Sequence, residues 1–263
     1  MPLREVIESR VLGAVKFLDN PTQAVVTRLL NVSANDTSFI RNRSHHYVIN
    51  NAPGLADHTT SFMAPPATPP LGSVAVHITV SDPVKRYLPR IVTVNLPRDP
   101  DPEHSDQADS LFRAVEVQLY SAPTFALHPN WSGIRASITQ AGTDGTSVGG
   151  ALLRVIRASD DVVLARGYSD PRGEALVVIP GIPITNFATD EPSEEDADAS
   201  GPVVIAETAV RVEAIVDDSL PWPVNPDVLE ANRASWLRDT GGPILLTLRT
   251  GQIQFINIEV DLS

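Results

Sequence analysis

Proline is the residue that most limits how this chain can fold, because it occurs 23 times among the 263 residues. A proline has no backbone N–H, and its ring clashes with the preceding helical turn, so it favours turns, loops and edge strands. The run 64–70 holds four prolines, which excludes both a helix and a central strand there. We therefore expect short strands joined by turns and no long helix.

Two segments of the first half alternate apolar and polar residues with a period of two. The segment 72–81 places its apolar residues on one face, at Val74, Val76, Ile78 and Val80. The segment 90–96 alternates in the same way. A period of two is typical of a half-buried strand, since successive side chains point to opposite faces.

Similar apolar runs predict the remaining strands, at 10–18, 25–32, 47–49, 115–119, 133–139, 151–156, 162–168, 174–179, 203–216, 244–248 and 253–260. The last two are expected to form a hairpin across Thr250-Gly251. A single helix is predicted from Pro226 to about Arg238, with Asn225 as its cap. The predicted fold class is all-β, with two antiparallel β-sandwich domains of immunoglobulin-like or transthyretin-like type and one short helix.

Two polar stretches suggest the domain limits. Residues 98–109 contain almost nothing apolar, and the following strand at 115–119 either closes the first sandwich or bridges to the second. We expect an N-terminal sandwich over 1–98, an acidic linker with a bridging strand over 99–130, and a C-terminal sandwich over 131–263. The acidic stretch 189–201 is expected to be a surface loop, because its clustered carboxylates repel one another.

Between about residues 132 and 182, the second half contains Gly150-Ala151, a strand that leads to Asp170, a tight turn at Gly173 and an apolar strand after it. In this order these features resemble the carboxypeptidase regulatory-like, or transthyretin-like, β-sandwich family. The inserted Pro171-Arg172 is a variation of that turn. This resemblance implies a fold and no particular activity.

The chain as a whole is similar to two-sandwich accessory proteins of contractile injection systems and phage tail-like particles. The similarity rests on the layout and on three short motifs, Ser81-Asp82-Pro83, Arg86-Tyr87-Leu88-Pro89-Arg90 and Leu96-Pro97-Arg98-Asp99. It implies a non-enzymatic structural or docking protein that binds neighbouring protein subunits of a particle through sandwich loops and edges.

Charge and composition limit the partners. The formal net charge of −12 argues against nucleic acid, whose phosphates need a cationic surface. The absence of cysteine excludes disulfides and thiolate sites. No apolar run reaches the length of a membrane span, and the first residues lack a signal-peptide pattern. We expect synthesis in the cytoplasm without a signal peptide, followed by assembly into a phage-like particle.

The catalytic motifs that occur lack the context that their chemistry requires. Residues 145–149 spell G-x-S-x-G around Ser147, but a strand follows where a helix is needed, and no histidine comes after His128. Asp239-Thr240-Gly241 occurs once, whereas an aspartic protease needs two such carboxylates. No H-x-x-x-H pair, EF-hand or phosphate-binding loop occurs. The sequence predicts no enzyme, no cofactor and no metal site; a hydrolase using Ser147 or Asp239 is the weaker alternative.

Interfaces rest on aromatic and arginine side chains, which gives five candidate contact residues. These are Trp131, Trp222, Arg86, Tyr87 and Arg90. Prolines on both sides hold Trp222 rigid, as suits a protein contact or a sugar-stacking platform. The alternative function is therefore a carbohydrate-binding or adhesion module, with glycan as its partner. Both tryptophans also fit the ordinary role of a buried sandwich residue.

Overall fold

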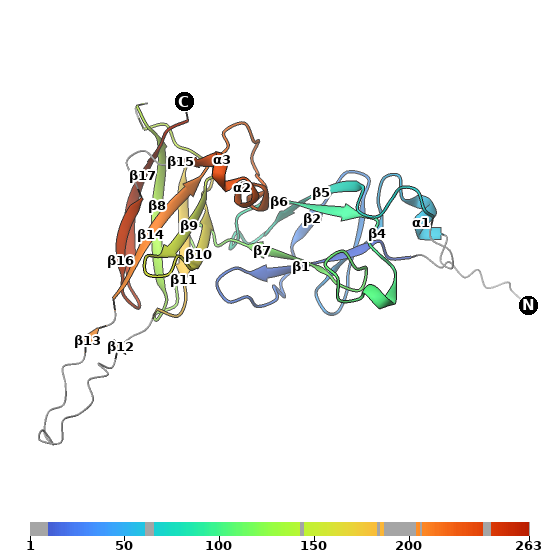
Figure 1. Cartoon of the computed structure of the whole chain (residues 1–263), viewed down its shortest axis with the longest axis horizontal. Coiled ribbons are helices and arrows are strands. Elements are labelled where there is room, and N and C mark those ends of the chain that lie inside the picture. Colours follow the sequence, from blue (N-terminus) through green and yellow to red (C-terminus); the bar gives the residue numbers. More distant parts are fainter. Residues whose placement is uncertain are drawn as a thin grey trace, which may run out of the picture. The chain divides into compact units, whose positions relative to one another are not determined.

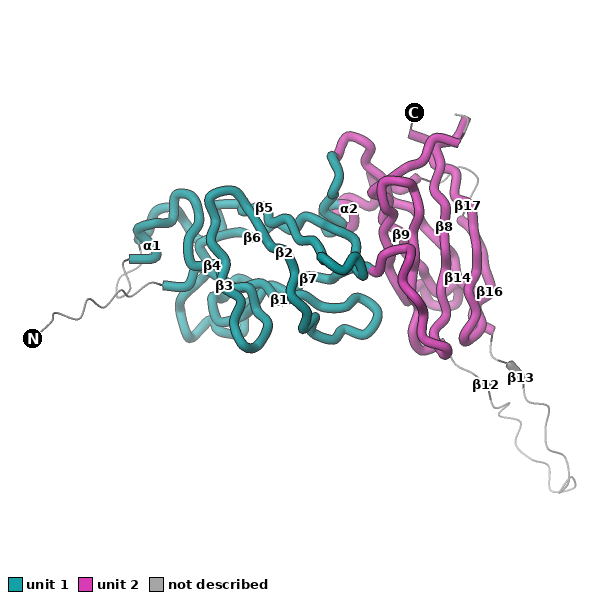
Figure 2. Tube along the Cα trace, turned by 180° about the vertical axis from the view of Figure 1, so that it is seen from behind, with its two compact units in different colours: residues 1–120, 221–228 teal, residues 121–220, 229–263 magenta. Residues whose placement is uncertain are grey.

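The structure is a computed structural model that describes residues 10–60, 66–142, 145–182, 185–186, 204–205, 207–238 and 243–262. The chain divides into two compact units (Figure 2). Unit 1 comprises residues 1–120 and 221–228, and unit 2 comprises 121–220 and 229–263. The segment 99–120, expected to be a linker with a bridging strand, is thus assigned to unit 1. So is 221–228, which is far away in the sequence.

Unit 1 begins with a four-stranded sheet in the order β3-β4-β1-β7. β1, β4 and β7 are labelled in Figure 1, and β3 is labelled in Figure 2. Its strands are β1 (Gly13–Asp19), β3 (Ser38–Arg41), β4 (Tyr47–Asn51) and β7 (Val115–Leu119). β4 pairs with β1 and β3 in antiparallel fashion, whereas β7 runs parallel to β1, with Val115 opposite Val15. The strand at 115–119 therefore belongs to the first sandwich.

A second sheet of unit 1 has the order β2-β5-β6. Its strands are β2 (Asn31–Ser33), β5 (Val74–Ser81) and β6 (Arg90–Leu96), all antiparallel. The two sheets enclose one apolar core, to which both contribute buried side chains, among them Phe17, Ile49, Ile78, Leu96 and Leu119. A short helix α1 (Ala56–Thr60) and a 3₁₀ turn η1 (Pro102–His104) lie in the connections.

Unit 2 is a second sandwich. One sheet contains β9 (Leu152–Arg157), β10 (Val163–Tyr168), β14 (Thr208–Ile215), β15 (Leu237–Arg238) and β16 (Ile244–Leu248), with β14 paired to β9, β15 and β16. The other has the order β11-β8-β17, with β8 (Ser132–Gln140), β11 (Glu174–Ile179) and β17 (Ile253–Val260). Their facing sides form a core of aliphatic residues.

Short elements complete the described chain. β12 (Thr185–Asn186) and β13 (Val204–Ile205) form an antiparallel pair. The helices α2 (Pro226–Ala231) and α3 (Arg233–Trp236) occupy the region where one helix was predicted. Asn232 separates them, and the predicted last turn is instead β15, which pairs with β14. None of the helices in the described residues has the length and apolar character needed to cross a membrane.

The all-β sandwich class predicted from the sequence is confirmed, and three details differ. Two strand pairs are parallel, β1 with β7 and β8 with β17. The predicted strand 25–32 is reduced to a bridge from Val25 to Leu18 and the start of β2. The predicted hairpin of 244–248 and 253–260 is wrong, because β16 pairs with β14 and β17 pairs with β8.

Candidate binding site

The candidate site of unit 1 is built around Arg98, which follows β6. Its side chain is only 9% exposed. The aliphatic part crosses Gly13 of β1, where an added Cβ would lie 3.1 Å from Arg98 Cδ. The absence of a side chain at Gly13 therefore leaves space for the arginine to lie inside the unit.

Backbone carbonyls of the following loop receive the guanidinium of Arg98. Nε donates to the carbonyl of Ser110 at 3.0 Å, and Nη2 donates to the carbonyls of Ala108 and Arg113. Burial lowers the pKa of Arg98 below its ordinary value, as does the charge of Arg113, while the charge of Asp109 acts in the opposite direction. The loop predicted as an exposed linker is thus fastened to a buried cation.

An ion pair also organises this loop. His104 Nδ1 lies 2.7 Å from Asp99 Oδ2, and a second oxygen of Asp99 accepts from the amide of Asp101. The Asp101 amide and the His104 ring hold the pKa of Asp99 below its usual value. The hydrogen bond to Asp99 raises the pKa of His104. No sequence pattern predicts this pair, because an exposed acidic stretch looks the same with or without it.

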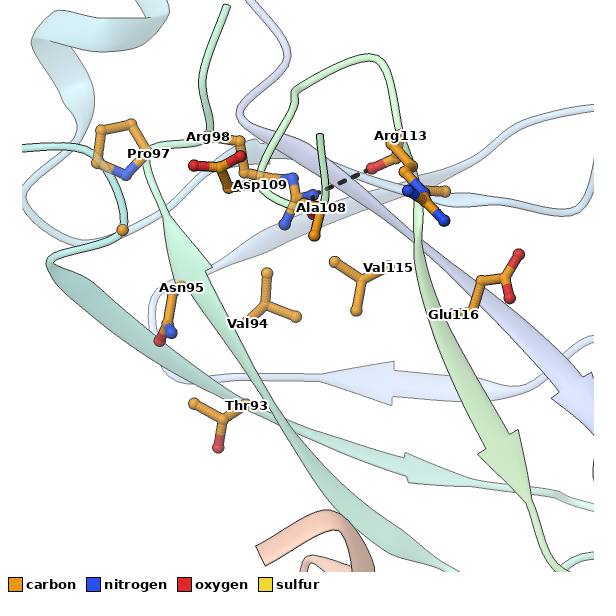
Figure 3. A pocket seen from close by; sticks show the side chains of 12 residues that line it. Thr93, Val94, Asn95, Pro97, Arg98, Ala108, Asp109, Arg113, Val115 and Glu116 are labelled. Atoms are coloured by element: carbon orange, nitrogen blue, oxygen red, sulfur yellow. Dashed lines mark hydrogen bonds between the residues drawn. The ribbon is translucent and has the colours of Figure 1, made fainter. Parts of the chain in front are cut away.

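An open cleft of about 490 Å³ lies beside Arg98 in unit 1 (Figure 3). Val94 of β6 and Val115 of β7 point toward one another in it, and Arg98 and Arg113 lie together at one end of the view. Glu116 lies just below Arg113 in this view, and its hydrogen bond to Lys16 lowers its pKa. The lining of the cleft combines apolar side chains with charges of both signs.

The structure places Tyr87 and Arg86 inside a hydrogen-bonded cluster of unit 1. Tyr87 is 6% exposed, and its hydroxyl donates to Asp19 Oδ1 at 2.9 Å. Burial, followed by the charge and hydrogen bond of Asp19, raises the pKa of Tyr87 to about 12. The guanidinium of Arg86 lies 5.8 Å from the centre of the Tyr87 ring. Tyr87 therefore has an internal role in this structure.

Arg90 is completely buried, although the sequence offered it as a contact residue. Its Nη1 donates to the carbonyl of Gln118 at 2.7 Å. Its Nη2 donates to the side chains of Asn225 and Asp227, which belong to the segment 221–228 of the same unit. The guanidinium also lies over the ring of Tyr120. This arginine fastens a distant segment to unit 1 and is not available at the surface.

The two candidate tryptophans are half-buried. Trp131 precedes β8, and its ring contacts His128 edge to face at 4.6 Å between centroids. Trp222 lies in the unit 1 segment between two prolines and is also half-buried.

Of the two residues named for a hydrolase, the structure describes Ser147 only. Ser147 is exposed and forms an antiparallel bridge with Thr139, and a strand follows it. Asp239 and the acidic loop 189–201 lie outside the described residues. In the part of the chain that the structure describes, no group of three or more acidic or histidine side chains is placed to hold a metal ion.

A surface that sequence reasoning missed lies at the edge of unit 2. β17 is the last strand of its sheet, with β8 as its single partner among the described residues. Its outward residues include Ile253 and Phe255, and Phe255 is 74% exposed. Leu245 of β16 is 70% exposed, and the two strands are linked by a hydrogen bond from Gln254 to the Thr247 carbonyl. We name Ile253 and Phe255, which share the outward face of this edge strand, the β17 edge surface.

The signal for this surface was present in the sequence. β17 carries large apolar residues on both of its faces. Ile253 and Phe255 lie on the exposed face, and Ile256 and Ile258 lie on the face turned to the core. The expected hairpin assigned this strand a partner that it does not have. The unpaired edge therefore became visible only once the pairing of β17 was known.

No protein family and no curated protein matches this chain. Among solved structures, the chain is similar to the TIE protein of Bacillus anthracis, with 8% identity and a TM-score of 0.27. The alignment covers 95% of this chain and 33% of that one, so this chain spans about a third of that protein's length. A likeness at this level carries no argument about fold or function. The transthyretin-like and injection-particle resemblances remain predictions.

Proposed function

We propose that this protein is a non-enzymatic docking component that binds a neighbouring protein subunit through the β17 edge surface. The observation that supports this proposal is the outer edge of β17, which pairs with no strand of the described residues, together with the exposed Phe255. Free edges of sheets are liabilities that natural proteins usually shorten or cover, and β17 is eight residues long. An extended edge that also exposes large apolar side chains fits a covering partner.

The partner is expected to supply an extended strand. Main-chain hydrogen bonds along the edge would give affinity, while pockets for alternate side chains would give specificity. Ile253 and Phe255 lie two residues apart on the same side of the strand, so the partner needs apolar residues with the same alternation. The resemblance to accessory proteins of contractile injection systems makes a phage tail-like particle the proposed setting.

The test compares two exposed phenylalanines. Phe255→Lys places a charge on the edge of unit 2, and Phe112→Lys places the same charge on an exposed residue of unit 1 that is 60% accessible. Particles are purified from the native host that carries each variant, and this chain is quantified in them by mass spectrometry. We expect the amount of this chain in purified particles to fall at least tenfold for Phe255→Lys and to stay at the wild-type level for Phe112→Lys.

Two outcomes would overturn the proposal in different ways. If this chain is absent from wild-type particles, the phage tail-like particle is not its setting. Equal incorporation of Phe255→Lys and Phe112→Lys removes the β17 edge surface as the docking site. Circular dichroism of both purified variants checks that each is folded.

A further inference from the structure

β6 is the last strand of its sheet in unit 1, and part of its outer edge is open. Ile91 directs its backbone away from β5, because its N–H donates to the carbonyl of Val224 at 2.9 Å. In an antiparallel pair every second residue faces the same way, so Thr93 and Asn95 also direct their N–H and C=O groups outward. Neither backbone has a hydrogen-bond partner on that side among the described residues.

β7 is the last strand of the other sheet of unit 1, and its outer edge faces that of β6. The two edges are joined at one end, where the N–H of Leu88 donates to the carbonyl of Tyr120 at 2.9 Å. Next to this bond, Arg90 Nη1 donates to the carbonyl of Gln118 at 2.7 Å. Because Gln118 faces β6, the backbone of Glu116, two residues earlier in the strand, faces β6 as well.

Beyond this junction, the open cleft of about 490 Å³ separates the two edges. In Figure 3, Thr93 and Asn95 of β6 lie on one side of the cleft and Glu116 of β7 lies on the other. The cleft has the volume of roughly sixteen water molecules, and the β6 stretch 93–97 spans about 16 Å. A free strand edge is a template for pairing with another chain, so this cleft offers what an inserted strand needs.

The chain already places one of its own segments on this edge. The carbonyl of Val224 accepts from the N–H of Ile91. The next residue follows the edge further, since Asn225 Nδ2 donates to Thr93 Oγ1 at 3.3 Å. Helix α2 begins directly after it, so no later residue of this segment follows β6 in extended form. The occupied part of the β6 edge therefore ends where the cleft begins.

We propose that the cleft between β6 and β7 binds an extended segment of a different protein. The backbone of this segment would pair with the outward groups of Thr93 and Asn95, which would give affinity. An apolar side chain of the segment would lie between Val94 and Val115, which point toward one another in the cleft. This site is in unit 1, and the β17 edge surface is in unit 2.

Charge limits the occupant of the cleft. Its charged lining residues are two arginines and two carboxylates, namely Arg98, Arg113, Asp109 and Glu116. Because these charges balance, an uncharged segment fits, and nucleic acid does not find the cationic surface that it needs. A second copy of this chain is disfavoured, since both copies would carry the net charge of −12.

The direct test follows amide hydrogen exchange of the full-length protein by NMR, with a synthetic peptide as probe. The probe is a blocked peptide of alternating threonine and valine residues, and its control has the same side chains with every backbone nitrogen methylated. We expect the probe to slow the exchange of the Thr93 and Asn95 amides at least tenfold and saturably. The control should slow it less than twofold, because methylation removes the donors of a β ladder.

Two pairs of variants locate the binding, with affinity read from the Thr93 amide resonance. Asn95→Pro removes an outward N–H that β5 does not use, whereas Asn95→Ala keeps it. We expect the affinity for the probe to fall at least tenfold in Asn95→Pro and to stay unchanged in Asn95→Ala.

The second pair fills the cleft. Ala108→Trp adds bulk at an exposed lining residue, and Ala24→Trp adds the same side chain at an exposed residue of unit 1 outside the lining. We expect only Ala108→Trp to block the probe. Because both alanines are exposed, this pair tests the cleft even where Asn95→Pro fails to fold.

The result is independent of the docking proposed for unit 2. Phe255→Lys changes the β17 edge surface and should leave the protection of Thr93 and Asn95 by the probe as it is in the wild-type protein. A loss of that protection in Phe255→Lys would mean that the peptide acts through unit 2 and would overturn this inference alone.

Four further results would overturn the inference. Unchanged exchange of Thr93 and Asn95 with the probe would show that the cleft accepts no strand. Equal protection by the methylated control would exclude backbone pairing. Undiminished binding in Ala108→Trp would place the peptide elsewhere. A dimer of the free chain in analytical ultracentrifugation that Asn95→Pro dissolves would make a second copy the occupant.

Discussion

The turn after β5 in unit 1 and the turn after β10 in unit 2 share their chemistry. Both begin with Ser-Asp-Pro, and each aspartate carbonyl accepts from the amide three residues later at 2.9 Å, that of Lys85 in unit 1 and that of Gly173 in unit 2. Each aspartate side chain, of Asp82 and of Asp170, also accepts from the amides two and four residues later. A side chain that organises its own turn in this way is a local device that sequence can specify.

The two turns nevertheless connect strands that are paired in different ways. In unit 1 the turn lies between β5 and β6, which pair with each other. In unit 2 it lies between β10 and β11, which pair with β9 and β8 in separate sheets. The turn therefore sets the local bend of the chain, whereas the pairing of the flanking strands is decided by partners that lie far away in the sequence.

The residue in the left-handed conformation also differs. Lys85 has φ 58° and is exposed, while Gly173 has φ 77° and is packed against β8. A Cβ at Gly173 would lie 2.4 Å from the carbonyl oxygen of Ile138. Glycine is thus required by packing in unit 2, and in unit 1 a side chain is tolerated at the expense of some strain.

The largest expected effect comes from Gly173→Ala. Left-handed strain and the clash with the Ile138 carbonyl should together lower the free energy of unfolding of unit 2 by about 3 kcal/mol. Urea unfolding, with amide hydrogen exchange of β8 and β11, measures this loss. Lys85→Ala is the matched control and should change stability by less than about 0.5 kcal/mol. A loss below about 1 kcal/mol for Gly173→Ala would contradict the distinction.

An intermediate effect is expected from Asp82→Ala and Asp170→Ala. Each removes the acceptor of two backbone amides in a nearly buried setting, so each should cost about 2 kcal/mol. The partner arginines should add little, because Arg28 is partly exposed and Arg172 is largely exposed. Chemical denaturation of the two variants checks the equality. If the losses of unfolding free energy differ by more than about 1 kcal/mol, the ion pairs with Arg28 and Arg172 contribute to stability, contrary to this prediction.

The smallest expected effect is a gain from Lys85→Gly. Glycine adopts the left-handed conformation without strain, which should raise the stability of unit 1 by about 0.5–1 kcal/mol after the entropy of the unfolded chain is counted. The shift of the denaturation midpoint, with hydrogen exchange of β5 and β6, measures it. A destabilised variant would indicate that the Lys85 side chain contributes a contact of its own.

Local patterns predicted most strands well and their partners poorly. The alternation of 90–96 gave β6 with its observed bounds, and the apolar run 174–179 gave β11 in the same way. The parallel pairing of β1 with β7 joins segments about a hundred residues apart, and no local period encodes such a choice. The helix prediction missed the break at Asn232 and ran past Trp236, where Leu237 and Arg238 pair with β14 instead.

The candidate site was less predictable than the fold. Arg90 and Tyr87 stood out in the sequence as arginine and aromatic residues, yet burial gives both an internal role. Arg98 stood in a short sequence motif, but nothing in that motif marks it as buried, because a lone arginine in a loop carries no pattern. The carbonyls of Ser110, Ala108 and Arg113 that accept its hydrogen bonds are visible only in three dimensions.

The attachment of 221–228 to unit 1 has a consequence for how the protein is made. The fully buried Arg90 donates to Asn225 and Asp227, which the ribosome adds more than a hundred residues later. At a synthesis rate of about 5–20 residues per second, the segment 221–228 is added roughly 5–25 s after the rest of the N-terminal sandwich. During that interval this cation lacks those two acceptors, so the N-terminal sandwich is incomplete in any polypeptide that stops before residue 228.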